Sequence, residues 1–518
     1  MSTVGLDLGT TGVRAVAFDA EGHQLASASR PTPRLSPRPG WWELDAEALL
    51  LDVEAVIGEV AARVAQDGDP VRAVAFASQG EAVVPVDAAG RALAGVPLGL
   101  DARGATAAAA LAARLGADRV QQLTGQPSHR MFSVAKIAEG GPAWRSRDVA
   151  AYRTLADFVA GRLGAPPAAD WTAAARTGMF DVSQRAWSRE VLTAVAADAP
   201  WLTPDRLSPL VSPGTDLGPL DPDVADRVGL SRCTLLVAGM HDQAASYVGA
   251  GGRPGEVSVY ALGSSDCLAV GTTTRPGGLS GTGFATYPWR RDRWITLAGS
   301  AAGGLAVEWV AELVRAGGVE ALVAEASPHP SPLLVLPYLA GSGTLDNDPG
   351  VRGSVLGLTL ATTRAEVARA FLEASGFELG VLLEAFLTVG VVVGDLRAVG
   401  TGATSAVALG ARADACGSAL TPAPGRSSAR GAALLAAAAL GEVDVDDLPP
   451  APLGPPRCPV ASTAAWYARQ RRAYRALALA LRDFEHAHGP VATEGPPACP
   501  APVPIPDHPA HPTDRTTP

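Results

Sequence analysis

The sequence predicts an α/β protein of at least two domains, and three observations support this prediction. Continuous apolar strands alternate with segments whose apolar residues recur at helical spacing, which is the pattern of an α/β domain. The chain has 518 residues, more than a single hydrophobic core usually contains. A hairpin at residues 4–19 returns in form at residues 257–270, so each domain is expected to begin with the same unit.

The first hairpin carries an unusual combination of residues. Two apolar strands at residues 4–8 and 12–18 flank a turn that contains Thr10 and Thr11. The hydroxyls and backbone N–H groups of such a turn are donors for an anionic oxygen. Asp7 lies within the first strand, where a carboxylate is costly unless it is paired or binds a metal. The pattern suggests a nucleotide phosphate with Mg²⁺, and an ordinary hairpin with a solvated Asp7 is the alternative.

The rest of the first half alternates between strands and helices. Apolar residues at helical spacing predict a helix over residues 46–66. Continuous apolar runs predict strands at residues 71–77 and 82–86. Residues 105–210 are rich in alanine and are expected to be mainly helical. A strand at residues 235–239 then runs into a further helix.

A glycine-dense stretch at residues 249–255 marks the expected boundary between the domains. We therefore expect a first domain over residues 1–248 and a second over residues 249–485. Within the second domain, the sequence predicts strands at residues 257–262, 267–270 and 396–400 and helices at residues 303–316, 363–388, 430–440 and 460–485. Residues 486–518 are dominated by Pro, Ala, Thr and His and are expected to form a disordered tail.

Charge and cysteine content limit the partners and the compartment. The net charge is −10 and the chain has no basic run, which argues against nucleic acid as a partner. Apolar runs such as residues 431–440 are too short to span a bilayer, so no membrane association is expected. The five cysteines form no CxxC pair, and the chain enters a strand at once without a signal peptide. We expect a cytoplasmic protein, and a homodimer is one option for its assembly.

Several motifs occur in an order that resembles the FGGY family of carbohydrate kinases over residues 4–480. They are GLDLGTTGVRAVAFDAEG, LTGQPSHRMFSVAKIAE, AARTGMFDVSQRAWS, GMHDQAASYVGAG, YALGSSDCLAV, LPYLAGSGTLDNDPGVRGSVLGLT and VGTGATSAVALGARADACGSAL. The resemblance implies two actin-like (ribonuclease H-like) α/β domains that flank a cleft. It further implies transfer of the γ-phosphoryl group of ATP, with Mg²⁺, to a hydroxyl group of a small sugar or polyol.

The resemblance assigns the central roles to two carboxylates. Asp242, in the segment GMHDQ, corresponds to the family's catalytic base and would also contact the acceptor. A helix N-cap is the alternative role for Asp242. Asp7 would bind Mg²⁺. His241 beside the base would orient Asp242, touch the substrate, or be a structural residue.

The resemblance also implies a nucleotide site and an acceptor site. The residues expected to contact the nucleotide are Thr10, Thr11, Arg14, Gly263, Ser264, Gly402 and Ala403. Alternatively, Arg14 is a solvated strand residue and the last two belong to a plain loop. The residues expected to contact the acceptor, besides Asp242, are Gln79, Glu81, Asp101 and Arg103. A surface carboxylate is the alternative for Glu81.

The acceptor segment departs from the family pattern at two positions. Gly80 replaces an Arg that glycerol kinases carry, and Gly99 replaces a Trp. We expect both changes to enlarge the pocket, so that neither xylulose nor glycerol can be assumed as the substrate. Two other functions stay open: a nucleotide-driven switch like actin or Hsp70, and a non-catalytic kinase homologue. The acceptor segment together with Asp242 argues against the first, and Asp7 with Asp242 argues against the second.

Overall fold

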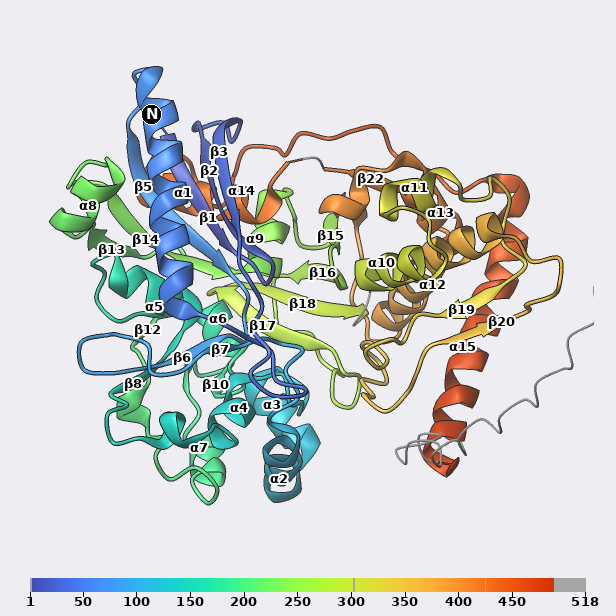
Figure 1. Cartoon of the computed structure of the whole chain (residues 1–518), viewed down its shortest axis with the longest axis horizontal. Helices are drawn as coiled ribbons and strands as arrows, with labels where there is room; N and C mark the ends of the chain where they lie inside the picture. Colours follow the sequence, from blue (N-terminus) through green and yellow to red (C-terminus); the bar gives the residue numbers. More distant parts are fainter. Residues whose placement is uncertain (1, 301–302, 424, 489–518) are drawn as a thin grey trace, which may run out of the picture.

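Two six-stranded sheets form the centre of the protein, whose computed structural model describes residues 2–300, 303–423 and 425–488 (Figure 1). The first sheet has the order β13-β14-β5-β1-β2-β3, formed by Asp216–Pro219, Leu235–His241, Val71–Ser78, Ser2–Leu8, Gly12–Phe18 and Gln24–Pro31. The second has the order β17-β18-β16-β15-β21-β22, formed by Ala285–Arg290, Arg293–Ser300, Asp266–Thr272, Val257–Leu262, Asp395–Val399 and Leu420–Pro422.

The two sheets repeat one topology. In the first, β1, β2 and β3 form an antiparallel meander, and β5 and β14 continue parallel to β1. In the second, β15, β16 and β18 form the meander, and β21 and β22 continue parallel to β15. The internal repeat predicted from the two hairpins is therefore confirmed and extends over five strands of each sheet.

Fifteen α-helices and four short 3₁₀ helices lie in the described part of the chain. The first half contains α1 (Ala46–Gln66), α2 (Ala105–Leu115), α3 (Ala117–Thr124), α4 (Ser133–Ala138), η1 (Pro142–Arg145), α5 (Leu155–Arg162), α6 (Trp171–Ala175), α7 (Arg189–Val195), η2 (Pro204–Arg206), α8 (Pro222–Val228) and α9 (Asp242–Gly249). The second contains α10 (Gly303–Leu313), α11 (Val319–Ala324), α12 (Arg364–Thr388), η3 (Thr401–Ala403), α13 (Ala406–Cys416), α14 (Ser427–Ala439), η4 (Ala461–Thr463) and α15 (Ala464–His488).

Helix α1 shows how the sequence sets these elements. Asp45 is its N-cap, and the carboxylate accepts hydrogen bonds from the N–H groups of Glu47 and Ala48 at 2.9 and 3.0 Å. The apolar stripe that predicted the helix is buried against β2 and β3 of the first sheet. The predicted range and the observed range of this helix are the same. The long helices predicted in the second half also occur, within a few residues of their expected ends.

The two sheets are joined through α9 and α14, which pack on each other between them. Figure 1 shows α14, from the second half of the chain, beside β1 of the first sheet. Glycines permit this close approach: a Cβ on Gly5 would lie 1.7 Å from the carbonyl oxygen of Ala429, and one on Gly431 would lie 2.0 Å from that of Ala245. Helix α14 of the second half thereby contacts the strand that carries Asp7.

The region between β5 and β13 was predicted to be mainly helical over residues 105–210, and this prediction is only partly right. The helices α2 to α7 are short and alternate with small two-stranded sheets. These pairs are β6 (Val83–Val86) with β8 (Ala151–Thr154), β9 (Ala169–Asp170) with β12 (Leu210–Val211), and β10 (Phe180–Asp181) with β11 (Ala186–Trp187). A further pair, β4 (Glu43–Leu44) with β7 (Val96–Pro97), precedes α2 in the sequence. Strands of two to four residues are too short to show a hydrophobic period.

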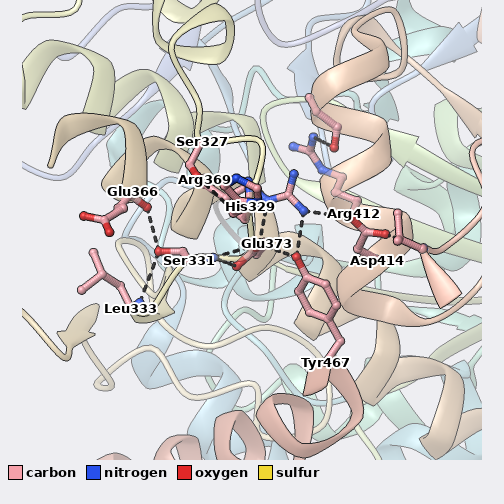
Figure 2. A network of polar contacts seen from close by, with 12 residues as sticks. Ser327, His329, Ser331, Leu333, Glu366, Arg369, Glu373, Arg412, Asp414 and Tyr467 are labelled. Carbon is pink, nitrogen blue, oxygen red and sulfur yellow. Dashed lines mark hydrogen bonds and ion pairs between the residues drawn. The ribbon is translucent and has the colours of Figure 1, made fainter. Parts of the chain in front are cut away.

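A buried polar network fixes the outer helices of the second half (Figure 2). Arg369 and Glu373 of α12 form an ion pair at 2.6 Å, and Arg369 also contacts Asp414 of α13 at 2.9 Å. Tyr467 of α15 donates a hydrogen bond to Glu373 at 2.6 Å. Glu373 is fully buried, so these partners are needed to satisfy its charge. The same helices border a further pair of strands, β19 (Leu334–Leu336) and β20 (Ser354–Leu356).

The C-terminal end of the described chain differs slightly from the expectation. Helix α15 continues to His488, beyond residue 486 where the tail was predicted to begin. The remainder of the predicted tail, residues 489–518, lies outside the described residues. Within the described ranges, we find no helix with the length and apolar character needed to cross a membrane.

Candidate active site

The ends of three neighbouring parallel strands bring the predicted catalytic residues together. In the first sheet, Leu8 at the end of β1 lies opposite Ser78 at the end of β5, and His241 at the end of β14 also lies opposite Ser78. Asp7, Gln79 and Asp242 therefore emerge at the same edge of the sheet. The carboxyl ends of parallel strands are the usual position of a ligand site in an open α/β sheet.

Asp7 is held by a residue from the far end of the chain. Its Oδ2 accepts a hydrogen bond from the hydroxyl of Ser428, in α14, at 2.9 Å. The guanidinium of Arg14, on the adjacent strand β2, approaches the same oxygen at 3.6 Å. Burial raises the pKa of the Asp7 carboxyl above its ordinary value, although Ser428, Arg14 and Arg426 oppose this change. The alternative interpretation of Asp7 as a solvated hairpin aspartate is therefore wrong.

The turn beside Asp7 is tight and its threonines lie at the surface of the site. The Gly9 N–H donates to the Gly12 carbonyl oxygen at 3.1 Å and closes the turn. Thr10 is partly exposed and Thr11 is exposed. The Nε of Arg14 is buried and has no hydrogen-bond partner among the described residues. The Arg14 side chain is 32% exposed, and its position beside Asp7 fits a role toward an anionic ligand.

Asp242 begins helix α9, and its side chain is 28% exposed. His241 has the N-cap position, so Asp242 is not the cap that the alternative interpretation required. Burial and the nearby charges of Asp7 and Glu81 raise the pKa of the Asp242 carboxyl to about 8. Such a carboxyl accepts a proton readily near neutral pH, which is the property that a general base requires.

Glu81 is 8% exposed and forms an ion pair with Arg176, which follows α6. The Nε of Arg176 donates to Oε1 of Glu81 at 2.7 Å, and its Nη1 donates to Oε1 of Gln126 at 2.8 Å. Burial opposes ionisation of Glu81, but the charge of Arg176 overrides it and holds the pKa of this carboxyl below its ordinary value. Glu81 is therefore not a surface carboxylate.

The two glycines of the acceptor segment have different surroundings. A Cβ on Gly80 would lie 2.5 Å from Cγ of Arg176 and 2.7 Å from Cδ2 of His241. The expectation that Gly80 enlarges the pocket is wrong, because other side chains fill that space. A Cβ on Gly99 would find only Oε2 of Glu81, at 3.8 Å. The space beside Glu81 is therefore open at Gly99.

Asp101 and Arg103 are bound to each other. Asp101 is fully buried and accepts from the Nε and Nη2 of Arg103 at 2.8 and 2.7 Å, and from the Trp42 N–H at 2.7 Å. Arg103 pairs in turn with Glu43 at 2.6 Å, and its guanidinium stacks over the Trp41 ring. This arrangement fits a support for the acceptor segment, and direct contact of the pair with the acceptor stays a prediction.

Gln79 is the residue of the acceptor segment with free hydrogen-bonding capacity. Its side chain is 6% exposed, and its backbone N–H donates to the carbonyl oxygen of Leu8 at 3.2 Å. Its Nε2 is buried without a hydrogen-bond partner in the described residues. A buried donor of this kind is costly unless a ligand or water accepts its hydrogen bond.

The second sheet has a similar turn, which follows the end of one of its parallel strands. The parallel strands β15 and β21 end side by side, and Gly263 and Ser264 follow β15 as an exposed turn. The N–H groups of Gly304 and Leu305 donate to the carbonyls of Gly263 and Ser264 at 3.0 and 3.1 Å, which fastens the turn to the start of α10. The position of this turn is compatible with phosphate contact.

The small residues after β21 pack closely against β15. A Cβ on Gly402 would lie 2.8 Å from Cβ of Leu262, which directly precedes the second turn. Ala403 is 8% exposed and belongs to the core of the second domain. The structure thus places both residues beside the second turn, and their contact with adenosine stays a prediction.

The second hairpin faces the carboxylates of the first domain. Burial raises the pKa of the Cys267 thiol to about 12, and the charges of Asp242, Asp266 and Glu81 act in the same direction. Residues that sequence reasoning did not select also reach this region: Arg176, Ser428 and, on β17, Tyr287. Arg176 lies in one of the quoted motifs, but nothing in the sequence indicated the partners of the other two.

The chemistry of this site suits Mg²⁺ held mainly by phosphates and water. Among residues 2–300, 303–423 and 425–488, no group of three or more His, Cys, Asp or Glu side chains could hold a metal ion. Mg²⁺ keeps several waters in proteins and often needs only one or two carboxylates besides nucleotide phosphates. Asp7, 17% exposed beside the first turn, fits that requirement.

Comparison with known proteins relates both halves of the chain to one protein family. Residues 2–249 match the N-terminal domain of the FGGY family of carbohydrate kinases, and residues 258–440 match its C-terminal domain. A xylulose kinase of Klebsiella pneumoniae is 30% identical over 390 residues, which cover 73% of this chain and 77% of that protein. A glycerol kinase of Rhodospirillum rubrum is 31% identical over 399 residues, covering 74% and 78%.

The fold is similar to that of a solved structure over almost the whole chain. The xylulose kinase of Rhodospirillum rubrum has a TM-score of 0.81 at 25% identity and covers 94% of this chain and 100% of that one. Two repeated α/β domains of actin-like fold, with kinases as relatives, define a phosphotransferase that acts on an alcohol group. The chain belongs to the FGGY family of carbohydrate kinases. This result confirms the resemblance and favours a kinase over a nucleotide-driven switch.

Proposed function

We propose that the protein is an ATP-dependent kinase for a small sugar or polyol, with Asp242 as the general base. The observation that carries this proposal is the position of Asp242 at the strand edge shared with Asp7 and Gln79, with its carboxyl pKa raised to about 8. A base with a pKa near the working pH is the most effective in proton transfer.

The proposed reaction needs few protein groups. An acceptor hydroxyl hydrogen-bonded to Asp242 attacks the γ-phosphorus, and its proton passes to the Asp242 carboxylate. The new bond joins the acceptor oxygen to the γ-phosphorus, while the bond to the oxygen bridging the β- and γ-phosphorus atoms breaks and releases ADP. Mg²⁺ held near Asp7 would neutralise phosphate charge. Thr10, Thr11 and Arg14 on one side and Gly263 and Ser264 on the other would hold the phosphates.

The acceptor would lie against the first domain. The unpartnered Nε2 of Gln79 would donate to one acceptor hydroxyl, and the Glu81 carboxylate would accept from another. The opening beside Gly99 gives room for an acceptor group next to Glu81. These features favour a polyhydroxylated acceptor with hydroxyls on adjacent carbons. Gly402 and Ala403 would lie at the edge of the adenosine site, beside the second phosphate turn.

The proposal is tested by ADP release in a screen of pentuloses, hexuloses, aldonic acids and polyols with MgATP. We expect one class of acceptor to raise ADP release well above the acceptor-free rate. For that acceptor, Glu81→Gln should raise its KM and leave the KM for ATP unchanged. If no acceptor raises ADP release from a protein that binds ATP, the proposed function is wrong.

We also propose a cellular compartment and an oligomeric state for the enzyme. A cytoplasmic location would supply ATP and keep cysteines such as Cys233 and Cys458, both exposed, in the reduced form. A homodimer would be detected as a molecular mass of twice 52.6 kDa in light scattering.

A further inference from the structure

His241, directly before the proposed base, is held from several sides. Its backbone N–H donates to the hydroxyl of Thr172 at 2.7 Å. Its Nδ1 lies 2.7 Å from the hydroxyl oxygen of Tyr287, and its Nε2 lies 3.2 Å from Oδ1 of Asp242. The ring is 4% exposed and meets the Tyr287 ring edge to face. One imidazole therefore bridges a buried phenol and the proposed catalytic carboxylate.

Tyr287 lies on β17 of the second sheet but is fastened to the first domain. The neighbouring Thr286 donates its N–H to the carbonyl oxygen of Gly125 at 2.7 Å. Gln121 donates its Nε2 to the carbonyl oxygen of Phe284 at 2.9 Å. Both contacts hold the strand where the Tyr287 hydroxyl reaches His241, so the phenol has a fixed position relative to the imidazole.

The space for the imidazole depends on Gly80. A Cβ at this position would lie 2.7 Å from Cδ2 of His241, closer than such atoms normally approach. Gly80 is one of the two departures from the family pattern, and His241 is the unusual residue beside the base. The structure thus links two sequence features that lie far apart in the chain.

We propose that Tyr287 and His241 form a hydrogen-bonded chain that positions Asp242 for proton transfer, in a pocket that Gly80 leaves open. The proposal rests on the proposed function of Asp242 as base. Tyr287 and His241 are positioning residues, since they act on the acceptor only through Asp242.

The direction of the chain follows from the protonation states. Burial and the charge of Arg176 lower the pKa of His241 to about 3, although Glu81 opposes this, so its imidazole is neutral. Burial holds the pKa of the Tyr287 phenol far above its ordinary value, so the phenol keeps its proton. A neutral imidazole has one donor and one acceptor nitrogen. In the proposed chain the Tyr287 O–H donates to Nδ1, which leaves the proton on Nε2, because a donor facing the ionised Asp242 is more favourable than an acceptor.

This chain stabilises one orientation of the Asp242 carboxylate. A proton on Nε2, which lies 3.2 Å from Oδ1, would engage that oxygen and leave the second oxygen of the carboxylate for the acceptor hydroxyl. Loss of the phenol allows the imidazole proton to move to Nδ1, and then an acceptor nitrogen faces the carboxylate instead of a donor. The ionised base would lose both its orientation and a favourable contact.

The first test compares two buried tyrosines. Tyr287→Phe should lower kcat about tenfold, with little change in the KM for ATP, and shift the acid limb of the kcat–pH profile upward. Tyr247→Phe is the matched control, because the Tyr247 hydroxyl is buried in α9 with no hydrogen-bond partner among the described residues. Equal kcat values and equal pH profiles for the two variants would overturn the proposal.

Substitution of the imidazole provides a rescue test. His241→Ala should lower kcat more than Tyr287→Phe does. His241→Gln retains an N–H group near the position of Nε2 and should recover part of the loss. Gly80→Ala should also lower kcat, because the added methyl group meets both the imidazole and the Arg176 side chain. If a folded His241→Gln protein has a kcat no higher than that of His241→Ala, the proposed role of a donor N–H group is contradicted.

A spectroscopic measurement separates this proposal from the proposed function. In protein labelled with ¹⁵N-histidine, we expect His241 to carry its proton on Nε2 and to show no titration between pH 6 and 8, values that bracket the ordinary histidine pKa of about 6.5. Tyr287→Phe should change the tautomer. An Nδ1-protonated His241 in the wild-type protein would refute the chain even in an active kinase. Absence of kinase activity with the expected tautomer would refute the proposed function instead.

Discussion

Ser428 donates a hydrogen bond to Oδ2 of Asp7 across 2.9 Å, although α14 and β1 lie at opposite ends of the chain. The contact brings a helix of the second domain to the proposed Mg²⁺ ligand. It orients one carboxylate oxygen and satisfies part of its charge within a buried site. The position of α14 therefore affects the chemistry of the first domain.

Ser428→Ala should weaken the response to Mg²⁺. Loss of the hydroxyl removes the protein donor that orients Asp7, so the Mg²⁺ concentration for half-maximal activity should rise about tenfold, within the range known for supporting partners of metal ligands. Ser427→Ala is the control, because Ser427 precedes it on α14 and has no contact with Asp7 comparable to that of Ser428. Equal Mg²⁺ dependence in the two variants would contradict this role.

Gly431→Ala should separate α14 from α9. Its Cβ would lie 2.0 Å from the carbonyl oxygen of Ala245, so the helices must move apart. We expect a loss of about 1–3 kcal/mol in the free energy of unfolding, measured by chemical denaturation. Gly410→Ala, in α13 with nothing within 4 Å of its added Cβ, should instead gain up to about 1 kcal/mol through helix propensity.

Arg176→Ala should be among the most destabilising changes near the acceptor site. It leaves the buried Glu81 carboxylate without its partner, at an expected cost of about 3–5 kcal/mol in the free energy of unfolding. Arg119→Ala breaks an ion pair with Glu190 whose side chains are both more than 40% exposed, and should lower the stability far less, because solvent screens an exposed pair. Similar denaturation midpoints for the two variants would contradict the importance assigned to the buried pair.

Asp242→Asn should stabilise the folded protein at alkaline pH. Because the folded-state pKa of Asp242 is raised from 3.8 to about 8, the folded protein holds this proton more tightly than the unfolded chain does. Stability therefore falls as the pH rises between these two values. The side chain is partly exposed, so we expect a gain of about 1–3 kcal/mol for the variant at pH 8, since one pKa unit corresponds to about 1.4 kcal/mol.

The measurement is urea denaturation of both proteins at pH 8 and near pH 4. The difference in the free energy of unfolding between them should shrink toward the lower pH, because the carboxyl becomes protonated in the unfolded chain as well as in the folded protein. A difference independent of pH would show that Asp242 is not a carboxyl of raised pKa.

Local patterns in the sequence predicted the long elements well. The apolar stripe and the Asp45 cap of α1 are both encoded within a few residues, so its range was predicted correctly. Of the short strands between β5 and β13, β6 falls within the predicted strand 82–86. Others, such as β9 and β12, were missed, because their pairing with distant segments determines them. The close packing of α9 and α14 was also beyond sequence reasoning, since the glycines that permit it have no local signature.

In the candidate site, too, local sequence indicated the main residues but not their partners. Motifs near the ends of predicted strands indicated Asp7, Gln79 and Asp242. The structure brings these residues to one edge of the first sheet. The partners that set their properties come from elsewhere in the chain. Arg176 lies 95 residues from Glu81, and Ser428 lies 421 residues from Asp7. Contacts of this kind depend on tertiary packing, which also explains why Gly80 did not enlarge the pocket.

The proposed base is tested most directly by transfer of the γ-phosphoryl group from ATP to the acceptor found in the screen. The rates of wild-type and Asp242→Asn protein are compared at saturating concentrations of both substrates, with ATP affinity measured separately. We expect the variant to bind ATP normally and to transfer the group about 10²–10⁴ times more slowly, the range that general-base catalysis contributes. A folded Asp242→Asn protein that transfers the group at a rate close to that of the wild type would contradict the account.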